Sequence, residues 1–424
     1  MNKKLLLSGI TLSSIITTSA VNAAGFALRE QSVYGQGSSF AGIAAGGDIS
    51  TSFWNPATIS DVESSELQGA LNIISSDTEI ETTGSSNVIY GNLDETGNIG
   101  GTAIIPNIYY GMELNDRLSW GLALTAPYGS SSEAKKGSRS QYVSLKAEAS
   151  SLNFSPTIAY DVTNDLALAA GLQVQSIDLY LSRALPVGAG QGVFTAFDPT
   201  LEIEGDDTAI GFTLGAQYQT GNTSLGLGYR SGIEHDMNGS LKVDALGINA
   251  DVNLELELPS MITLGLKQQI NDKLSLGFTF EKADWSSVGT LLVKSNATGQ
   301  VATIAGNPVA IPLNYQDTNF YSIGGDYQYS DTLTLRSGLG LDETTVTDLT
   351  RTTQLPDNDR YWLSFGFSKT FDSLTLDAGY TYVKVNEVAE VNIVPGHASY
   401  NGLPYTGKSQ PSVHILAFSL TKQL

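Results

Sequence analysis

The sequence predicts an all-β protein, a transmembrane β-barrel of 14 antiparallel strands with an N-terminal hatch in its lumen. Three observations support this fold class: apolar and polar residues alternate along many segments, short polar turns separate these segments, and charges inside them fall on one parity. Alternate side chains of a strand point to opposite faces, so such alternation indicates strands with one apolar face. Clear examples are 274–280, 361–367 and 374–380.

The first 23 residues have the features of a secretory signal peptide. Lys3 and Lys4 precede an apolar run at 5–16, and small residues end at Ala23. The apolar run is too short for a membrane-spanning helix, which needs about 20 residues. We therefore expect a mature chain that begins at Ala24 and holds 424 − 23 = 401 residues.

Residues 24–65 differ from the rest of the mature chain, because they are rich in Gly, Ala and Ser and lack sustained alternation. They contain the motif Asn55-Pro56-Ala57, in which proline forces an extended residue before it and so favours a fixed turn. At about 40 residues the segment fits the lumen of a barrel of this size. We predict that 24–65 form a hatch, or plug, and that 66–424 form the barrel.

Short turns of Asn, Asp, Gly and Ser give the number of strands, since tight hairpins favour these residues. Six such turns occur: Asn115-Asp116, Asn164-Asp165, Gly221-Asn222, Asn271-Asp272, Ser330-Asp331 and Asp372-Ser373. They join six strand pairs, and one more strand is expected before the first pair (66–76) and one after the last (411–424), which gives 6 × 2 + 2 = 14. Short turns at one rim and long loops at the other are typical of outer-membrane barrels.

Charged residues within the strands test which face meets lipid. A basic residue facing the middle of a bilayer costs about 2–4 kcal/mol, so strand charges should avoid the apolar parity. Six charges do so: Arg230, Lys267, Glu281, Asp326, Arg336 and Asp377. This consistency favours a membrane barrel over a soluble β-sandwich.

Four of these charges lie four or five residues from a short turn, namely Lys267, Asp326, Arg336 and Asp377. We expect them to ring the lumen near its periplasmic end. Buried charges persist mainly when paired, so we expect pairing among them and with hatch residues such as Arg29, Glu30 or Asp48. Binding of an anionic ligand is the alternative.

Two other features are candidates for ligand binding. Arg230 and Arg139 lie away from the turns, and a guanidinium can hold a carboxylate through two hydrogen bonds. For Arg139 a solvated loop position is the alternative. The loop 183–205 is unusually apolar and contains Phe194 and Phe197, which indicates either an exposed binding patch or a lid over the barrel mouth.

Several chemical functions find no support. The absence of cysteine excludes disulfides, thiolate metal sites and a cysteine nucleophile, and the net charge of −21 argues against nucleic acid as a partner. His235, His397 and His414 have no neighbours at metal-ligand spacing, and no Gly-x-Ser-x-Gly motif occurs. We expect no metal, no cofactor and no enzymatic activity, with an outer-membrane lipase as the only enzymatic alternative.

Short motifs along the mature chain carry a resemblance to a known family. They are Ala24-Gly25-Phe26-Ala27-Leu28, Asn55-Pro56-Ala57, Ala126-Pro127-Tyr128-Gly129, Ser155-Pro156-Thr157, Leu258-Pro259-Ser260-Met261, Ala283-Asp284-Trp285-Ser286 and Leu355-Pro356-Asp357-Asn358. In this order they resemble the FadL/TodX-type (OMPP1) outer-membrane transporters of long-chain fatty acids and other hydrophobic compounds. One departure is the C-terminus, which ends at Leu424 rather than at the aromatic residue common in such barrels.

The resemblance implies a monomeric barrel in the outer membrane, in contact with its lipid and lipopolysaccharide. It implies passive uptake of hydrophobic small molecules, long-chain fatty acids first among them, without ATP or an energy-coupling protein. Ala24, Gly25, Phe26 and Leu28 would border the ligand pocket, and Asn55-Pro56-Ala57 would fix the hatch. Ligand-triggered movement of the hatch would then release the ligand sideways, near an inward kink of the third strand.

Two other functions stay open at this point. A structural or interaction barrel, such as an adhesin or phage receptor, would depend on the outer loops rather than on the lumen. A general hydrophilic porin would need an open lumen, which the expected hatch opposes.

Overall fold

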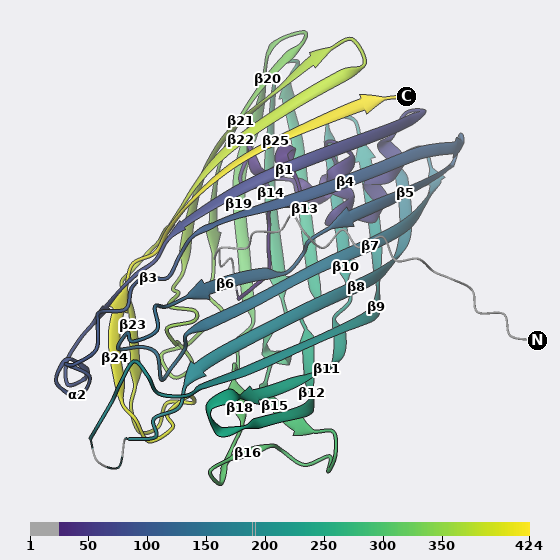
Figure 1. Cartoon of the computed structure of the whole chain (residues 1–424). Helices are drawn as coiled ribbons and strands as arrows, with labels where there is room; N and C mark the ends of the chain where they lie inside the picture. The colour runs from purple at the N-terminus through teal and green to yellow at the C-terminus, as the bar shows by residue number, and fades with distance from the viewer. Residues whose placement is uncertain (1–24, 189, 191) are drawn as a thin grey trace, which may run out of the picture.

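The computed structural model describes residues 25–188, 190 and 192–424, and the predicted signal peptide and Ala24 lie outside these residues. The chain forms a closed barrel of 14 antiparallel strand positions, as predicted (Figure 1). β1 (Ser65–Asp77) pairs with β4 (Thr102–Asn115) on one side and with β25 (Ser412–Gln423) on the other, which closes the wall.

Six further wall positions are each formed by one continuous strand: β7 (Lys146–Thr163), β8 (Leu166–Ala184), β9 (Thr200–Thr220), β20 (Leu333–Asp342), β21 (Arg360–Phe371) and β22 (Leu374–Val385). Five positions are each divided between two strands: β5 (Leu118–Thr125) with β6 (Gly129–Glu133), β10 (Thr223–Arg230) with β11 (Ile233–Val243), β12 (Ile248–Leu258) with β13 (Met261–Asn271), β14 (Leu274–Ala283) with β15 (Thr290–Ser295), and β18 (Ala310–Pro312) with β19 (Thr318–Ser330). The continuous strands, including β1, β4 and β25, and the divided ones add up to 9 + 5 = 14.

Smaller elements complete the loops and the lumen. The remaining strands are β2 (Glu79–Thr82), β3 (Gly97–Asn98), β16 (Thr303–Ile304), β17 (Asn307–Pro308), β23 (Ala389–Ile393) and β24 (Tyr405–Ser409). The short helices are α1 (Val33–Gln36), η1 (Ile43–Ala45), η2 (Ile49–Phe53), η3 (Pro56–Asp61), α2 (Ser86–Ile89), η5 (Asp244–Leu246) and η6 (Trp285–Ser287). Among the described residues, no helix is both long and apolar enough to cross a membrane.

All six predicted short turns join neighbouring antiparallel strands. They lie together at one end of the barrel, here called the turn rim, and the long loops lie at the other end, the loop rim (Figure 1). The first and last strands differ from the prediction by a single residue at each end. The turn count was therefore sufficient to predict the number of strands.

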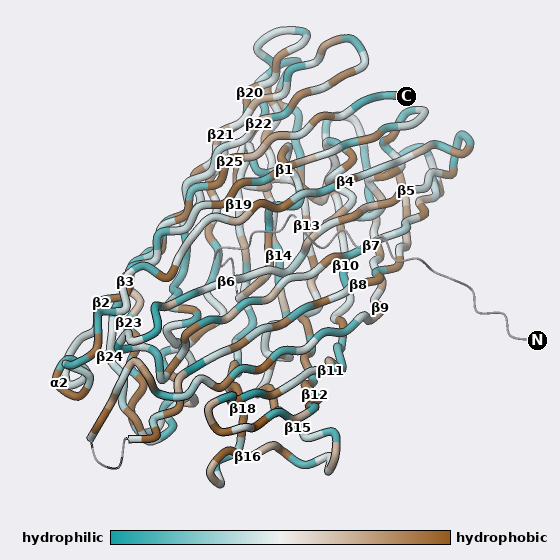
Figure 2. The backbone as a smooth tube through the Cα atoms, in the orientation of Figure 1, coloured by the Kyte–Doolittle hydropathy of each residue, from teal (hydrophilic) through white to brown (hydrophobic). Residues whose placement is uncertain are grey.

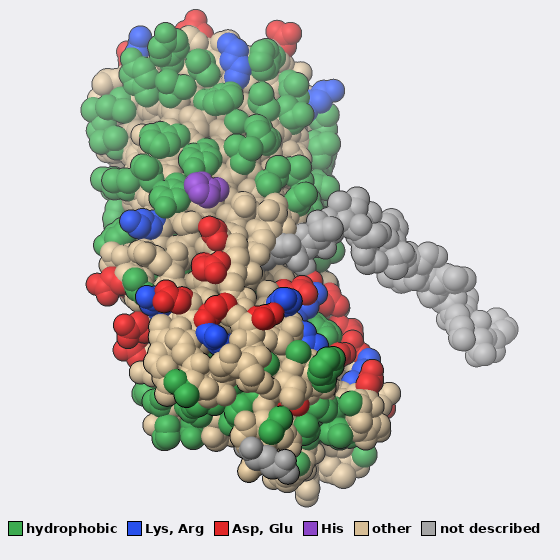
Figure 3. All heavy atoms as spheres, turned by 60° about the vertical axis from the view of Figure 1, so that its left-hand side comes forward, with side chains coloured by type: hydrophobic (Ala, Val, Ile, Leu, Met, Phe, Trp, Pro, Cys, Tyr) green, Lys and Arg blue, Asp and Glu red, His purple; other side chains and the backbone are tan. Residues whose placement is uncertain are grey.

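The outside of the wall is apolar near the turn rim. Hydrophobic and hydrophilic residues alternate along the strands (Figure 2), and the apolar ones are exposed, as at Leu172, Leu264 and Phe365. Figure 3 shows hydrophobic side chains covering one part of the molecule, with acidic and basic residues concentrated beyond it. Such an apolar band is the surface that a transmembrane barrel presents to lipid. The predicted charge parity is also confirmed, since Arg230, Glu281, Arg336 and Asp377 are buried inside the barrel.

Residues 25–64, here called the lumenal segment, lie inside the barrel and contain α1, η1, η2 and η3 (purple in Figure 1). The wall facing this segment carries glycine at many positions. A Cβ on Gly226 would lie 1.7 Å from the backbone oxygen of Ala44, and one on Gly338 would lie 2.0 Å from that of Ser38. Only glycine lets the two backbones approach so closely.

We call these wall positions the glycine belt: Gly215, Gly226, Gly228, Gly265, Gly277, Gly324, Gly338 and Gly366. They lie on neighbouring strands, as the pairing of Gly226 with Gly265 and of Gly324 with Gly338 shows. The belt therefore holds the part of the lumenal segment between Gly37 and Ala57 directly against the wall.

Candidate ligand site

The third wall position is interrupted by an inward bend. β5 ends at Thr125, and the chain resumes pairing at Gly129 as β6, which pairs with β7. β4 pairs with β5 only from Ile108 onward, so in the described structure residues 102–107 of β4 have no strand partner on this side. Pro127 lies at the bend and has no N–H to donate to a ladder. We call the interruption between β4 and β6 the wall gap.

The start of the lumenal segment occupies the inner side of the wall gap. The backbone N–H of Leu28 donates to Pro127 O at 2.8 Å, and that of Gly129 donates to Phe26 O at 2.8 Å. These two bonds bracket an antiparallel bridge between Ala27 and Tyr128. We call residues 25–31 the N-terminal arm, and it takes the place of a missing strand at the bend.

A cavity, here called the lumenal cavity, lies beside the arm. Its lining is mainly apolar and aromatic, and comprises Ala27, Leu28, Arg29, Phe53, Trp54, Pro127, Tyr128, Arg230, Met261, Glu281, Ala283, Trp285, Thr318 and Phe320. These residues come from the arm, the end of η2, the bend, η6 and the ends of β10, β13, β14 and β19. Such a lining is typical of a site for a hydrophobic small molecule.

A second cavity, the outer cavity, lies toward the loop rim and is bordered by Gly25 and Phe26. Its other walls are largely aliphatic, with Leu179, Leu181, Leu256, Leu291, Ile311, Leu313 and Leu355. Phe26 separates the two cavities, because its ring contacts those of Trp285 and Tyr128 at centroid distances of 5.2 and 5.9 Å. The two cavities therefore form successive apolar compartments that meet at Phe26.

Arg230 has a buried guanidinium that faces the lumenal cavity. It stacks over the Phe53 ring at 4.2 Å, but its Nε and Nη2 have no hydrogen-bond partner among the described residues. An unpaired buried charge is costly, so the position favours an incoming anion. A carboxylate fits best, because it can accept two hydrogen bonds from one guanidinium.

Arg29 lines the same cavity but is already paired. Its Nη1 lies 2.9 Å from Glu281 Oε1, and its Nη2 lies 3.8 Å from Asp342 Oδ1. The guanidinium also lies 3.7 Å from the centroid of the Phe320 ring. The arm is thus tied to the wall by an ion pair as well as by its backbone.

Asn55 connects the lumenal segment to the wall. Its Oδ1 accepts from Ala57 N at 3.0 Å, which caps η3, and its Nδ2 donates to Ala44 O at 2.7 Å and to Ala216 O at 3.0 Å. Pro56 follows at the first position of η3, where its missing N–H costs nothing. One amide side chain therefore joins η3, η1 and β9.

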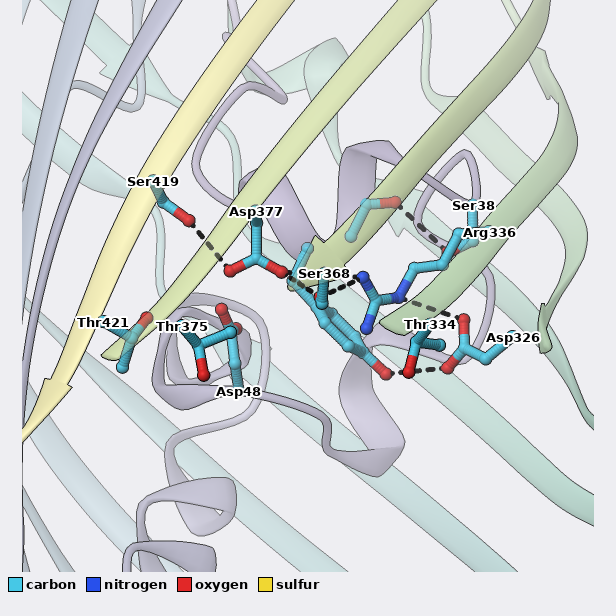
Figure 4. A network of polar contacts seen from close by, with 12 residues as sticks. Ser38, Asp48, Asp326, Thr334, Arg336, Ser368, Thr375, Asp377, Ser419 and Thr421 are labelled. Carbon is cyan, nitrogen blue, oxygen red and sulfur yellow. Dashed lines mark hydrogen bonds and ion pairs between the residues drawn. The ribbon is translucent and has the colours of Figure 1, made fainter. Parts of the chain in front are cut away.

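A network of ion pairs lies on the turn-rim side of the lumenal segment (Figure 4). Arg336 Nε lies 3.2 Å from Asp326 and its Nη1 lies 3.5 Å from Asp377, which confirms the predicted pairing of these charges. Tyr34 of α1 donates to Asp326 at 3.0 Å, and Lys267 donates to Tyr34 at 2.7 Å. The network joins the wall to the lumenal segment. This agrees with the expectation that these charges pair with one another rather than bind a ligand.

Of the hatch residues expected to pair with these charges, Asp48 lies within this network (Figure 4), whereas Arg29 and Glu30 lie outside it. Asp48 accepts hydrogen bonds from Ser50 and Gln68. Glu30 is fully enclosed, and neither of its carboxyl oxygens has a hydrogen-bond partner within the described residues. Burial raises the pKa of Glu30 to about 7, from an ordinary value of 4.5.

The raised pKa of Glu30 predicts a pH effect on stability. The unfolded chain loses this proton before the folded protein does, so the stability due to Glu30 is fully present below about pH 4.5 and is lost as the pH rises through about 7. We expect the melting temperature in detergent to fall between about pH 5 and about pH 8, and to fall less in Glu30→Gln. The same decrease in both proteins would contradict this assignment.

The structure places the remaining predicted residues in the loops. Arg139 pairs with Glu95 and donates to Asn87 at 2.8 Å. Phe194 packs against Tyr90 and Tyr142, whereas Phe197 is 94% exposed. None of the three predicted residues lines the lumenal or the outer cavity.

Arg230 and Leu28, which the sequence offered as ligand-binding residues, line the lumenal cavity, and Phe26 borders the outer one, whereas the partner of Glu281 was not predicted. Arg29 and Glu281 are 252 residues apart, so only the folded chain brings them together. Glu281 had one signal in the sequence, its place on the inward parity of a strand.

The chain is similar to known outer-membrane proteins over nearly its whole length. A family model described as "Outer membrane protein transport protein (OMPP1/FadL/TodX)" matches residues 14–423. The long-chain fatty acid transport protein of Escherichia coli O6:H1 is 24% identical, over 92% of this chain and 93% of that protein. Outer membrane protein P1 of Haemophilus influenzae is 25% identical, over 91% of each.

Solved structures match the fold as well. A Pseudomonas aeruginosa FadL homologue superposes with a TM-score of 0.83 at 23% identity, covering 94% of this chain and 99% of that one. The Pseudomonas putida toluene transporter TodX superposes with a TM-score of 0.66 at 19% identity, with the same coverage.

Proposed function

Because the chain belongs to the OMPP1/FadL/TodX family of outer membrane transport proteins, we propose that it takes up hydrophobic small molecules, long-chain fatty acids first among them, through the lumenal cavity. The protein is a transporter of the outer membrane rather than an enzyme. Its relatives include a long-chain fatty acid transport protein and a toluene transporter, so the nature of the ligand has to come from this chain's own residues.

The unpartnered guanidinium of Arg230 is the observation that favours a fatty acid. A hydrocarbon has no group that could pair with it, and its binding would leave the buried charge uncompensated. A fatty acid could place its carboxylate at Arg230 and its chain among Met261, Trp285 and Phe320. The lumenal cavity then satisfies both parts of the ligand.

The path of the ligand through the barrel can be inferred from the two apolar cavities and from the contacts that close the lumen on the turn-rim side. Apolar walls lead from the outer cavity past Phe26 to the lumenal cavity. On the turn-rim side the glycine belt and the ion pairs of Arg336 hold the lumenal segment in the lumen as a hatch. We propose that the ligand triggers movement of the arm and leaves sideways through the wall gap. An apolar ligand thereby reaches lipid without crossing water.

We also propose that the barrel is a monomer surrounded by outer-membrane lipid. The wall is closed at β1 and β25, which leaves no free strand edge between them and supports a monomer. Its exposed apolar band would lie in outer-membrane lipid, with the loop rim among lipopolysaccharide.

Replacing Arg230 by leucine tests the proposed ligand. A hydrogen bond to a charged group is worth about 1.5–3 kcal/mol, so we expect fatty-acid uptake at limiting concentration to fall about tenfold or more. Uptake of labelled toluene should stay within about twofold, because no charge is involved. Lys242→Gln, which changes an exposed ion pair between β11 and β9, is the control. Unchanged fatty-acid uptake by Arg230→Leu would contradict the proposed carboxylate site.

An interaction barrel is the second candidate, and the exposure of Phe197 favours it. This ring is 94% exposed at the loop rim, near Val187 and Val193, which are 64% and 49% exposed. Shortening the loop between β8 and β9 separates the two functions. Loss of cell or phage binding with normal fatty-acid uptake would support the interaction function, and loss of uptake would assign the loop to ligand capture.

A further inference from the structure

Three charged residues, Arg29, Arg230 and Glu281, line the lumenal cavity together. We propose that Glu281 makes release selective for anionic ligands, because it holds the N-terminal arm closed through Arg29 until a ligand carboxylate competes for that arginine. This inference rests on the proposed function and adds a charge-selective residue to it. It separates a carboxylic acid from an uncharged molecule of the same size.

The arm is held by backbone hydrogen bonds, by uncharged side chains such as Asn72 and Tyr109, and by an ion pair, and only the ion pair depends on charge. Its backbone hydrogen bonds to the bend at Pro127 and Gly129 join uncharged amide and carbonyl groups. The ion pair between Arg29 and Glu281 is different, because both side chains line the lumenal cavity. A charged ligand in that cavity therefore meets the ion pair directly.

Glu281 is fixed from the wall side. Its Oε2 accepts a hydrogen bond from Thr263 Oγ1 at 2.8 Å, and its Oε1 faces Arg29 at 2.9 Å. The second partner of Arg29, Asp342, lies farther away at 3.8 Å and does not line the cavity. Glu281 is thus the carboxylate that a ligand would have to replace.

Arg230 would bind the carboxylate of the ligand close to the Arg29–Glu281 ion pair. Arg230 lines the same cavity as Glu281, and its buried Nε and Nη2 have no hydrogen-bond partner among the described residues, so a ligand carboxylate bound at Arg230 adds negative charge beside Glu281. The added charge repels Glu281 and offers Arg29 another partner, which weakens the Arg29–Glu281 pair. An uncharged ligand fills the apolar volume and leaves the pair intact. Arm release thereby depends on the head group rather than on the chain.

The accessibility of the arm reports this step. The chain has no native cysteine, so a single Ala27→Cys variant of the full-length protein can be labelled with a maleimide in detergent. The probes are oleate and methyl oleate, which have nearly the same volume and would shield the cysteine equally. We expect oleate to raise the labelling rate about fivefold, and methyl oleate to change it less than about twofold.

Glu281→Gln in the same background removes the charge and keeps the shape. Arg29 retains Asp342 as a partner, and the amide can still accept from Thr263. Without any ligand we expect this variant to be labelled about as fast as the parent with oleate. Glu255→Gln, at an exposed pair with Lys294, is the matched control and should behave as the parent.

The outcomes separate the inference from the proposed function. Two results would overturn the selective role of Glu281 and leave hydrophobic uptake standing. One is that oleate and methyl oleate raise the labelling rate equally, and the other is that Glu281→Gln is labelled at the same rate as the parent. Fast labelling of Glu281→Gln with no response of the parent to oleate would overturn the fatty acid as ligand. The comparison of the two probes needs no variant of Glu281, so it holds even if that variant folds poorly.

Discussion

Cross-linking the arm to the bend, through Ala27→Cys and Tyr128→Cys, is expected to lower fatty-acid uptake by about tenfold or more. The two residues face each other in an antiparallel bridge, where Cα atoms lie about 4.5–5.5 Å apart, within the range that a disulfide spans. A locked arm would keep the wall gap covered. Uptake of labelled oleate by cells, measured under oxidising conditions and again after a reducing agent, should show loss and recovery.

A second cross-link provides the control for this result. Ser39 and Ser364 are hydrogen-bonded through their hydroxyls at 2.7 Å and join the lumenal segment to β21. A disulfide between Ser39→Cys and Ser364→Cys should leave uptake unchanged, because the glycine belt already holds this region against the wall. Full uptake with the arm locked would exclude release through the wall gap. Loss of uptake with the Ser39 cross-link would show that the whole segment has to move.

Replacing Gly226 by valine is expected to displace the lumenal segment from the wall. The backbone oxygen of Ala44 lies where the new Cβ would stand, 1.7 Å away, so the two backbones must separate. Overpacking of this kind costs about 1–3 kcal/mol, and here the segment can yield more easily than the barrel. We expect a steady ion conductance in planar bilayers and faster protease cleavage within 33–64, whereas the unaltered protein should conduct little.

Gly69 provides the matched control for the glycine belt. It lies on β1, and a Cβ there would meet nothing within 4 Å. Gly69→Val should therefore keep the low conductance of the parent. If Gly226→Val conducts ions as little as the parent, the position of the lumenal segment does not depend on the glycine belt.

The barrel could be predicted from the sequence because its signals are local. Alternation assigns each side chain to a face, and each hairpin is encoded in two or three residues, as at Asn164-Asp165. The number of strands and the inward charges follow from these signals without knowledge of the fold. Even the pairing of Arg336 with Asp326 and Asp377 could be expected, since all three lie at a similar distance from the turn rim.

The ligand site could be predicted only in part, because its contacts join distant parts of the chain. Arg230 stood out as an inward charge, but nothing near it showed that it lacks a partner while Arg29 has one. Composition showed many glycines without showing that those of the glycine belt face the lumenal segment. The apolar loop after β8 contains both a buried ring, Phe194, and an exposed one, Phe197, and alternation cannot separate them outside a strand.

Uptake of labelled oleate at limiting concentration, by cells that lack other fatty-acid transporters, tests the central claim most directly. Cells carrying this protein should take up oleate faster than cells with an empty vector, and Arg230→Leu should remove most of the difference. Equal uptake with and without the protein, when the folded barrel is present in the outer membrane, would contradict the central claim.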